Sequence, residues 1–207
     1  MSVVLVIIGL IVGGVLVGES LIAAAAVRAT ISQIEKYNQV ANTFFGKYGY
    51  LPGDIPAGPA AQFGFAARGT LPGQGDGNGL IQGNNCAGSV SGLNQAGGET
   101  VMFWEDLSTA GLIEGGFDTY SGWSCTASLT NLYYPQAKLG SYFIFAMGLN
   151  GINYFHFGAT YTGYGGGPGQ LAGGLTDMTV SQAYSIDTKT DDGFPQTGRV
   201  TAQYELP

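Results

Sequence analysis

The first fifty residues contain two consecutive patterns of hydrophobic positions. Residues 3–18 (VVLVIIGLIVGGVLVG) include no charged or hydrogen-bonding side chain. This run approaches the ~20 apolar residues that a helix needs to cross the hydrocarbon core of a bilayer. Further along, hydrophobic side chains recur at intervals of three and four, which indicates one apolar face on a helix. This face consists of Val27, Ile31, Ile34, Val40 or Ala41, Phe44 and Tyr48.

The two patterns predict one long helix. Arg28, Gln33, Lys36 and Asn38 fall away from the apolar face, and the stop signals Gly46, Gly49 and Pro52 follow. We therefore predict a helix of about 45 residues, ~65–70 Å long. Residues 1–20 would be apolar on all sides, and residues 21–50 would be amphipathic. Because a globular domain of ~150 residues cannot bury such a helix entirely, its first half needs lipid or the same halves of other copies.

Four glycines lie in the apolar run at spacings of four residues, Gly9 with Gly13 and Gly14 with Gly18. This spacing allows helix backbones to approach closely. Each glycine also weakens a helix by about 1 kcal/mol relative to alanine. Two interpretations follow, a packing surface between helices or a plain single-span anchor, in which glycines are common.

The remaining residues, 51–207, predict a globular domain of the α+β class, with a small antiparallel sheet and long loops. Residues 140–161 form the best hairpin signal, with its turn at Asn150-Gly151. Residues 51–98 are rich in Gly, Pro and Asn and are expected to form an ordered layer of loops. Short helices are predicted at 99–116 and 179–189, and a closing strand at 198–206. In the first of these helices we expect Val101, Trp104, Leu107 and Leu112 to face the core.

Composition and charge exclude some classes of protein. Charged residues make up only 10% of the chain, whereas it has 12 Tyr and 11 Phe, so it is not a disordered sequence. The net charge is −7, and residues 51–207 carry −8 because residues 1–50 carry +1. An acidic body repels phosphate backbones, so we expect no nucleic-acid partner.

Residues 2–56, from SVVLVIIGLIVGG to KYGYLPGDIP, resemble the N-terminal region of type IV pilins and of type II secretion pseudopilins. Weaker similarity returns at residues 103–113 (FWEDLSTAGLI) and 186–200 (IDTKTDDGFPQTGRV). The resemblance implies a long N-terminal helix packed on a small antiparallel sheet. It also implies a precursor in the inner membrane that a prepilin peptidase cleaves and that is usually methylated. An assembly machinery then extracts the copies and bundles their N-terminal helices into a filament.

The sequence departs from the family in two respects. Family members normally carry a glutamate directly before the position of Met1, preceded by a Phe and a basic leader. We therefore expect that the natural protein has residues before Met1. Many pilins also have a proline near Val17, which is absent here. Gly9, Gly13, Gly14 and Gly18 are expected to take over its helix-loosening role.

The two cysteines, Cys86 and Cys125, lie in loop-like stretches, NNCAGS and GWSCTAS. In an exported chain they would most simply form one disulfide, which would stabilise the fold by roughly 3–4 kcal/mol in the chain-entropy model. Two free buried thiols are the alternative.

Two acidic segments are candidates for calcium. Asp187, Asp191 and Asp192 lie within six residues in the part that loosely resembles the calcium-binding C-terminal loop of major pseudopilins. Oxygen clusters of this kind suit hard cations. In the alternative interpretation, Asp191 caps a turn and Lys189 or Arg199 neutralises the cluster. The second segment, GQGDGNG with Asp76 and Asn78, is either part of a calcium loop or a tight solvated turn.

Signals of an enzyme are weak. The single histidine, His156, is expected to be structural, and Glu105 and Asp106 are expected to point to different sides of their helix. The sequence favours a non-enzymatic subunit of a type IV pilus-like extracellular filament. A periplasmic pseudopilin of type II secretion and a membrane-anchored binding domain that never polymerises are the alternatives.

Overall fold

The computed structural model of the chain describes residues 2–84, 90–91, 97–117, 132–140, 142–158 and 178–202. The chain divides into two compact units. The first unit contains residues 1–33, 138–140 and 178–204, and the second contains residues 34–137, 141–177 and 205–207. The described elements are four helices and two small antiparallel sheets, in agreement with the predicted α+β class.

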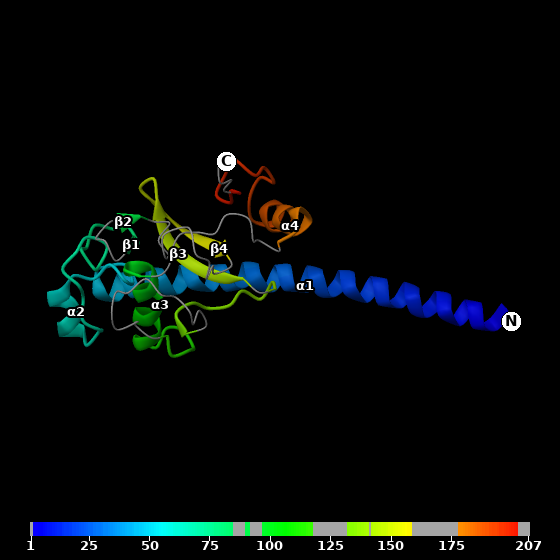
Figure 1. Cartoon of the computed structure of the whole chain (residues 1–207), viewed down its shortest axis with the longest axis horizontal. Coiled ribbons are helices and arrows are strands. Elements are labelled where there is room, and N and C mark those ends of the chain that lie inside the picture. The colour runs from blue at the N-terminus through cyan, green and yellow to red at the C-terminus, as the bar shows by residue number, and fades with distance from the viewer. Residues whose placement is uncertain are drawn as a thin grey trace, which may run out of the picture. The chain divides into compact units, whose positions relative to one another are not determined.

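The longest element, α1 (Ser2–Tyr48), confirms the predicted N-terminal helix (Figure 1). It is one continuous helix of 47 residues that contributes to both units. It ends where the sequence predicts, because Gly49 follows Tyr48 and donates its backbone N–H to the carbonyl of Phe45 at 2.8 Å.

In the first unit, α1 packs with helix α4 (Val180–Thr190) and residues 138–140. Its core is a small cluster in which Val27, Leu139 and Ile186 are buried, with Ile31 and Met178 packed against it. The helix α4 was predicted, and it begins with a capping box. The Thr179 hydroxyl accepts the N–H of Gln182, and the Gln182 side chain accepts the N–H of Thr179.

The second unit contains the predicted hairpin, formed by β3 (Phe143–Leu149) and β4 (Ile152–Gly158). Asn150 and Gly151 have φ of 52° and 80°. Positive φ at both central positions is the signature of a two-residue type I′ turn, which fits the twist of the two strands. The same unit holds helix α3 (Glu99–Thr109), helix α2 (Ala57–Phe63), and a second antiparallel pair of β1 (Gly83–Asn84) and β2 (Val90–Ser91).

Aromatic rings dominate the core of the second unit. Tyr37 of α1 meets Trp104 of α3 edge to face, with ring centroids 4.8 Å apart, and Phe155 of β4 lies 6.0 Å from the same indole. Nearer the end of α1, Phe44 contacts Phe65. Tyr37 is 8% exposed, although the predicted apolar face does not include it. It lies three residues after Ile34 and four before Ala41, so the same helical spacing places it on that face.

Three predictions for the globular part need correction. Residues 51–98 are not loops throughout, since they hold α2 and the β1–β2 pair. In α3, Val101, Trp104 and Leu107 are buried as predicted, but after the helix Ile113 is buried while Leu112 is partly exposed. Residues 198–202 are not a strand, because the backbone N–H groups of Arg199 and Val200 donate to the Asp191 carboxylate instead of to a neighbouring strand.

Candidate functional site

A continuous apolar surface covers the first turns of α1. Every large hydrophobic side chain here is more than half exposed: Val3, Val4, Leu5, Val6, Ile7, Ile8, Leu10, Ile11, Val12, Val15, Leu16, Val17, Leu21 and Ile22. We call residues 3–22 the apolar segment. Among the described residues, α1 is the one helix long and apolar enough to cross a membrane, a property that signal sequences share. Soluble monomers rarely expose apolar patches larger than a few hundred Å², so this segment needs lipid or protein around it.

The four glycines predicted to pack helices together lie on this open surface. A methyl group built on Gly9, Gly13, Gly14 or Gly18 would meet no atom within 4 Å. Within the described part of the chain, intramolecular packing therefore does not require glycine at these positions. A surface free of side chains at spacings of four residues is suited to a close helix–helix contact with another molecule.

Three carboxyl groups come together in the second unit, on Asp54, Asp76 and Glu99. Their oxygens lie within 4.8 Å of one another. Asp54 follows the turn after α1 and is 1% exposed, Glu99 begins α3 and is 0% exposed, and Asp76 is exposed. The sequence pointed to Asp76 alone, because Asp54 and Glu99 are far from it along the chain.

The glycine-rich loop 73–82 wraps around the two buried carboxylates with its backbone. Asp54 accepts the N–H groups of Gly77, Asn78 and Gly79, at 2.7, 3.2 and 2.7 Å. Glu99 accepts those of Gly75, Asp76 and Gln82, at 2.9, 3.4 and 2.8 Å. Backbone N–H groups that converge in this way form a nest, and here the nest holds carboxyl groups of the same chain.

Burial dominates the electrostatics of this cluster. It raises the pKa of Glu99 to about 8, against the opposing effect of the hydrogen bonds from Gln82 and Gly75. It raises the pKa of Asp54 to about 6, again against hydrogen bonds from the loop. Three carboxyl groups this close could hold a divalent cation or share protons. Among the described residues, the hydrogen bonds of this cluster attach loop 73–82 to the start of α3, and we call the cluster of Asp54, Asp76 and Glu99 the latch.

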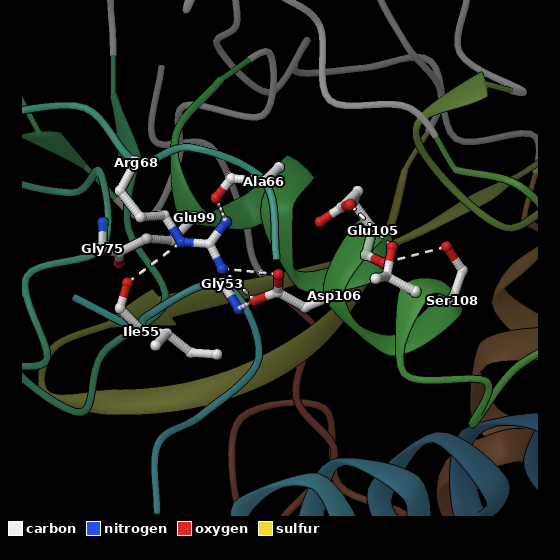
Figure 2. A network of polar contacts seen from close by, with 10 residues as sticks. Gly53, Ile55, Ala66, Arg68, Gly75, Glu99, Glu105, Asp106 and Ser108 are labelled. Atoms are coloured by element: carbon white, nitrogen blue, oxygen red, sulfur yellow. Dashed lines mark hydrogen bonds and ion pairs between the residues drawn. The ribbon is translucent and has the colours of Figure 1, made fainter. Parts of the chain in front are cut away.

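A buried ion pair lies beside this latch (Figure 2). The guanidinium of Arg68 reaches Asp106 of α3, with Nη2 2.6 Å from Oδ1 and 2.7 Å from Oδ2. Its other nitrogens donate to the carbonyls of Ile55 and Ala66, and the Gly53 N–H donates to Asp106 at 2.6 Å. Burial raises the pKa of Asp106, and the positive charge of Arg68 opposes that rise. Arg68 ties the turn after α1 to α3.

Glu105 and Asp106, neighbours on α3, hydrogen-bond to different partners, as expected of side chains that leave the helix in different directions. Both are buried, and burial followed by the charge of Asp106 raises the pKa of Glu105 to about 7. Both positions are buried because α3 is surrounded by protein on more than one face. Glu105 also accepts a hydrogen bond from the Thr109 hydroxyl at 2.9 Å.

The predicted calcium residues Asp187, Asp191 and Asp192 do meet in the first unit, at the end of α4. Their oxygens lie within 4.8 Å of one another. Asp187 accepts the Gly193 N–H at 3.2 Å, and Asp192 accepts the Phe194 N–H and the Thr197 hydroxyl. The bond from Phe194 is the main reason why the pKa of Asp192 lies below its usual value. The calcium interpretation stays a prediction.

His156 lies on β4, where burial lowers its pKa to about 4. The imidazole is therefore neutral at physiological pH, which agrees with the structural role expected for it. The predicted disulfide between Cys86 and Cys125 falls outside the described residues.

No protein-family model, curated protein or solved structure matches this chain. Its function must therefore follow from its own residues. Two kinds of feature stand out: the latch and ion pair, which lie inside the second unit, and the apolar segment, which the described residues of the chain leave exposed.

Proposed function

We propose that this chain is a structural subunit that polymerises through α1 into a type IV pilus-like extracellular filament. The observation that carries the proposal is the apolar segment, whose large hydrophobic side chains are more than half exposed along five turns of helix. The resemblance of residues 2–56 to pilins supports it, as does an α+β layout behind the helix. The work of such a subunit is assembly rather than catalysis.

The same segment fits two environments in turn. Before assembly it spans the inner membrane, and after assembly the equivalent segments of other copies enclose it. Removing on the order of 1,500 Å² of apolar surface from water at ~25 cal/mol per Å² yields tens of kcal/mol of gross driving force. Transfer from lipid yields far less, because lipid is already apolar. Extraction therefore requires an assembly machinery, and close helix packing must stabilise the filament.

The glycines provide the test. Replacing Gly9 and Gly13 by leucine is expected to leave membrane insertion intact and to abolish filaments, because the added side chains keep neighbouring backbones apart. Val12→Leu is a matched control, since it enlarges the same segment without filling a glycine position, and it should assemble normally. Filaments would be sheared from cells that express the full chain, imaged by electron microscopy and identified by mass spectrometry.

The outcomes separate the candidate functions. Surface filaments made of this chain support a pilus, whereas assembly confined to the periplasm supports a secretion pseudopilin. A wild-type chain that stays monomeric in the membrane contradicts polymerisation and leaves an anchored domain. Normal filaments from the Gly9→Leu, Gly13→Leu variant would contradict the role of close packing.

A further inference from the structure

The last turn of the apolar segment contains a lone negative charge, Glu19. Between Ser2 and Ile34, α1 carries only two charged residues, Glu19 and Arg28. Both side chains are exposed, and neither has a hydrogen bond or an ion pair with any residue that the structure describes. This stretch of α1 therefore presents one anion and one cation that the described residues of its own chain leave unpaired.

These two residues cannot pair within one copy. They are nine positions apart, which places them about 13.5 Å apart along the helix axis at 1.5 Å per residue. Nine steps of about 100° also turn the helix by about 900°, so that the two side chains point to opposite faces. Any partner for either charge must come from outside the helix.

Membrane insertion and assembly make different demands on Glu19. Residues 1–18 cover about 27 Å, close to the thickness of the hydrocarbon core, so Glu19 of an inserted copy lies near the lipid–water boundary and remains solvated. In a filament, Glu19 lies in the last turn of the segment that other copies enclose and loses much of its water. A carboxylate moved into such surroundings is destabilising unless a cation accompanies it.

We propose that Glu19 of one copy forms an ion pair with Arg28 of a neighbouring copy, which lies parallel to it and is displaced by about nine residues along α1. This inference rests on the proposed function. Copies inserted into one membrane share one orientation, which makes the helices parallel. The pairing fixes the displacement between them, because any other axial shift separates the two charges.

The placement on opposite faces gives the contact a further property. Each helix offers Glu19 to one neighbour and Arg28 to another, so the contact is head to tail. Repeated contacts of this heterologous kind, each with an axial displacement, do not close into a dimer and generate an open filament. The two charges thereby set the register of a polymer whose stability comes from the apolar segment.

A charge exchange in the full-length chain tests the pair. Glu19→Arg and Arg28→Glu are each expected to reduce sheared filaments at least tenfold, because like charges then face each other at every contact. The double variant is expected to regain at least half of the wild-type yield. Lys36→Glu is the matched control, a charge reversal at another exposed position of α1, and should assemble as the wild type does. The amount of each variant in the membrane fraction must be equal before yields are compared.

Crosslinking provides an independent measurement. Copies with Glu19→Cys, expressed together with copies carrying Arg28→Cys, should yield disulfide-linked dimers in sheared filaments. Glu19→Cys with Lys36→Cys should not, because those positions would then be separated by about eight residues at the proposed displacement, ~12 Å along the axis. Three results would each overturn the ion pair alone, provided that the wild type forms filaments. These are single variants that assemble as the wild type does, a double variant that does not recover, and filaments that lack the specific crosslink. A wild-type chain that forms no filament would overturn the proposed function and the ion pair with it.

Discussion

The backbone of Gly53 lies directly against the carbonyl of Glu99. A methyl group built on Gly53 would be 2.5 Å from Glu99 O and 2.9 Å from Phe103 N. Gly53 also has a φ of 84°, a conformation that other residues adopt only with strain. The turn that follows α1 can therefore approach the first turn of α3 only because this position has no side chain.

Gly53→Ala is accordingly expected to lower the free energy of unfolding by about 2–4 kcal/mol, through the close contact and the backbone strain together. The measurement is urea-induced unfolding of the full chain in detergent. Gly46→Ala is the control, since Gly46 lies within α1 and a methyl group there would meet no described atom of another segment within 4 Å. It should stabilise the chain by about 0.5–1 kcal/mol through helix propensity. Equal stability of the two variants would contradict the close approach.

The ion pair of Arg68 and Asp106 should be sensitive to the loss of one partner. Asp106→Asn leaves the Arg68 charge buried without a counter-charge, and we expect a loss of about 3–5 kcal/mol in the free energy of unfolding. Replacing both residues, as Arg68→Met with Asp106→Leu, should recover part of this loss because no unpaired charge remains. Glu105→Gln, at the neighbouring position, should cost less than about 1 kcal/mol at pH 6, where Glu105 is mostly protonated. A small effect of Asp106→Asn would show that water reaches Arg68.

Stability should depend on pH through Glu99. Its pKa is about 8 in the folded chain and near 4.5 when unfolded, so between these values the folded state binds more protons. The stabilisation is complete below about pH 4.5 and is lost as the pH rises through about 8, by a few kcal/mol in total. Asp54, with a pKa raised to about 6, changes the stability in the same direction over a lower range of pH.

Glu99→Gln removes the titrating group and should flatten most of this dependence between pH 5 and 8. The variant also loses one acceptor for the loop N–H groups, so its stability at pH 5 should be lower than that of the wild type. Urea unfolding at intervals of one pH unit measures both effects. If the free energy of unfolding of the variant depended on pH as strongly as that of the wild type, another titratable group would be its cause.

The sequence predicted what is determined locally. The helix α1, its end at Tyr48 and the type I′ turn at Asn150-Gly151 follow from periodicity and from turn chemistry within a few residues. The carboxylates of Asp187, Asp191 and Asp192 were grouped correctly because they lie close together in the chain.

Contacts between distant segments were not predictable in the same way. Asp54 and Glu99 lie in Gly- and Pro-rich surroundings that resemble solvent-exposed loops, yet both are buried, because a loop between them turns its backbone N–H groups toward them. Arg68 is one of seven basic residues, and nothing around it in the sequence indicates that Asp106 is its partner. Burial of a charged side chain depends on tertiary contacts that a periodic pattern does not encode.

The acidic cluster at the end of α4 allows the two interpretations of the sequence to be separated. One part of the capping interpretation is present, since Asp191 accepts the N–H groups of Arg199 and Val200. The other part, neutralisation by Lys189 or Arg199, is not seen, because the ion pair of Arg68 and Asp106 is the only one among the described residues. Calcium would supply the missing positive charge.

We therefore expect millimolar calcium to raise the midpoint of thermal unfolding of the wild-type chain by a few degrees, as a ligand that binds only the folded state does. Asp187→Asn should lose this shift, because Asn keeps an acceptor for the Gly193 N–H but carries no charge to attract the cation. Asp76→Asn, in the other acidic cluster, is the control for a general effect of the salt and should retain the shift. If the shift is equal in all three chains, calcium does not bind here and the cluster only caps the turn. In that case Asp191→Asn would destabilise the chain equally with and without calcium.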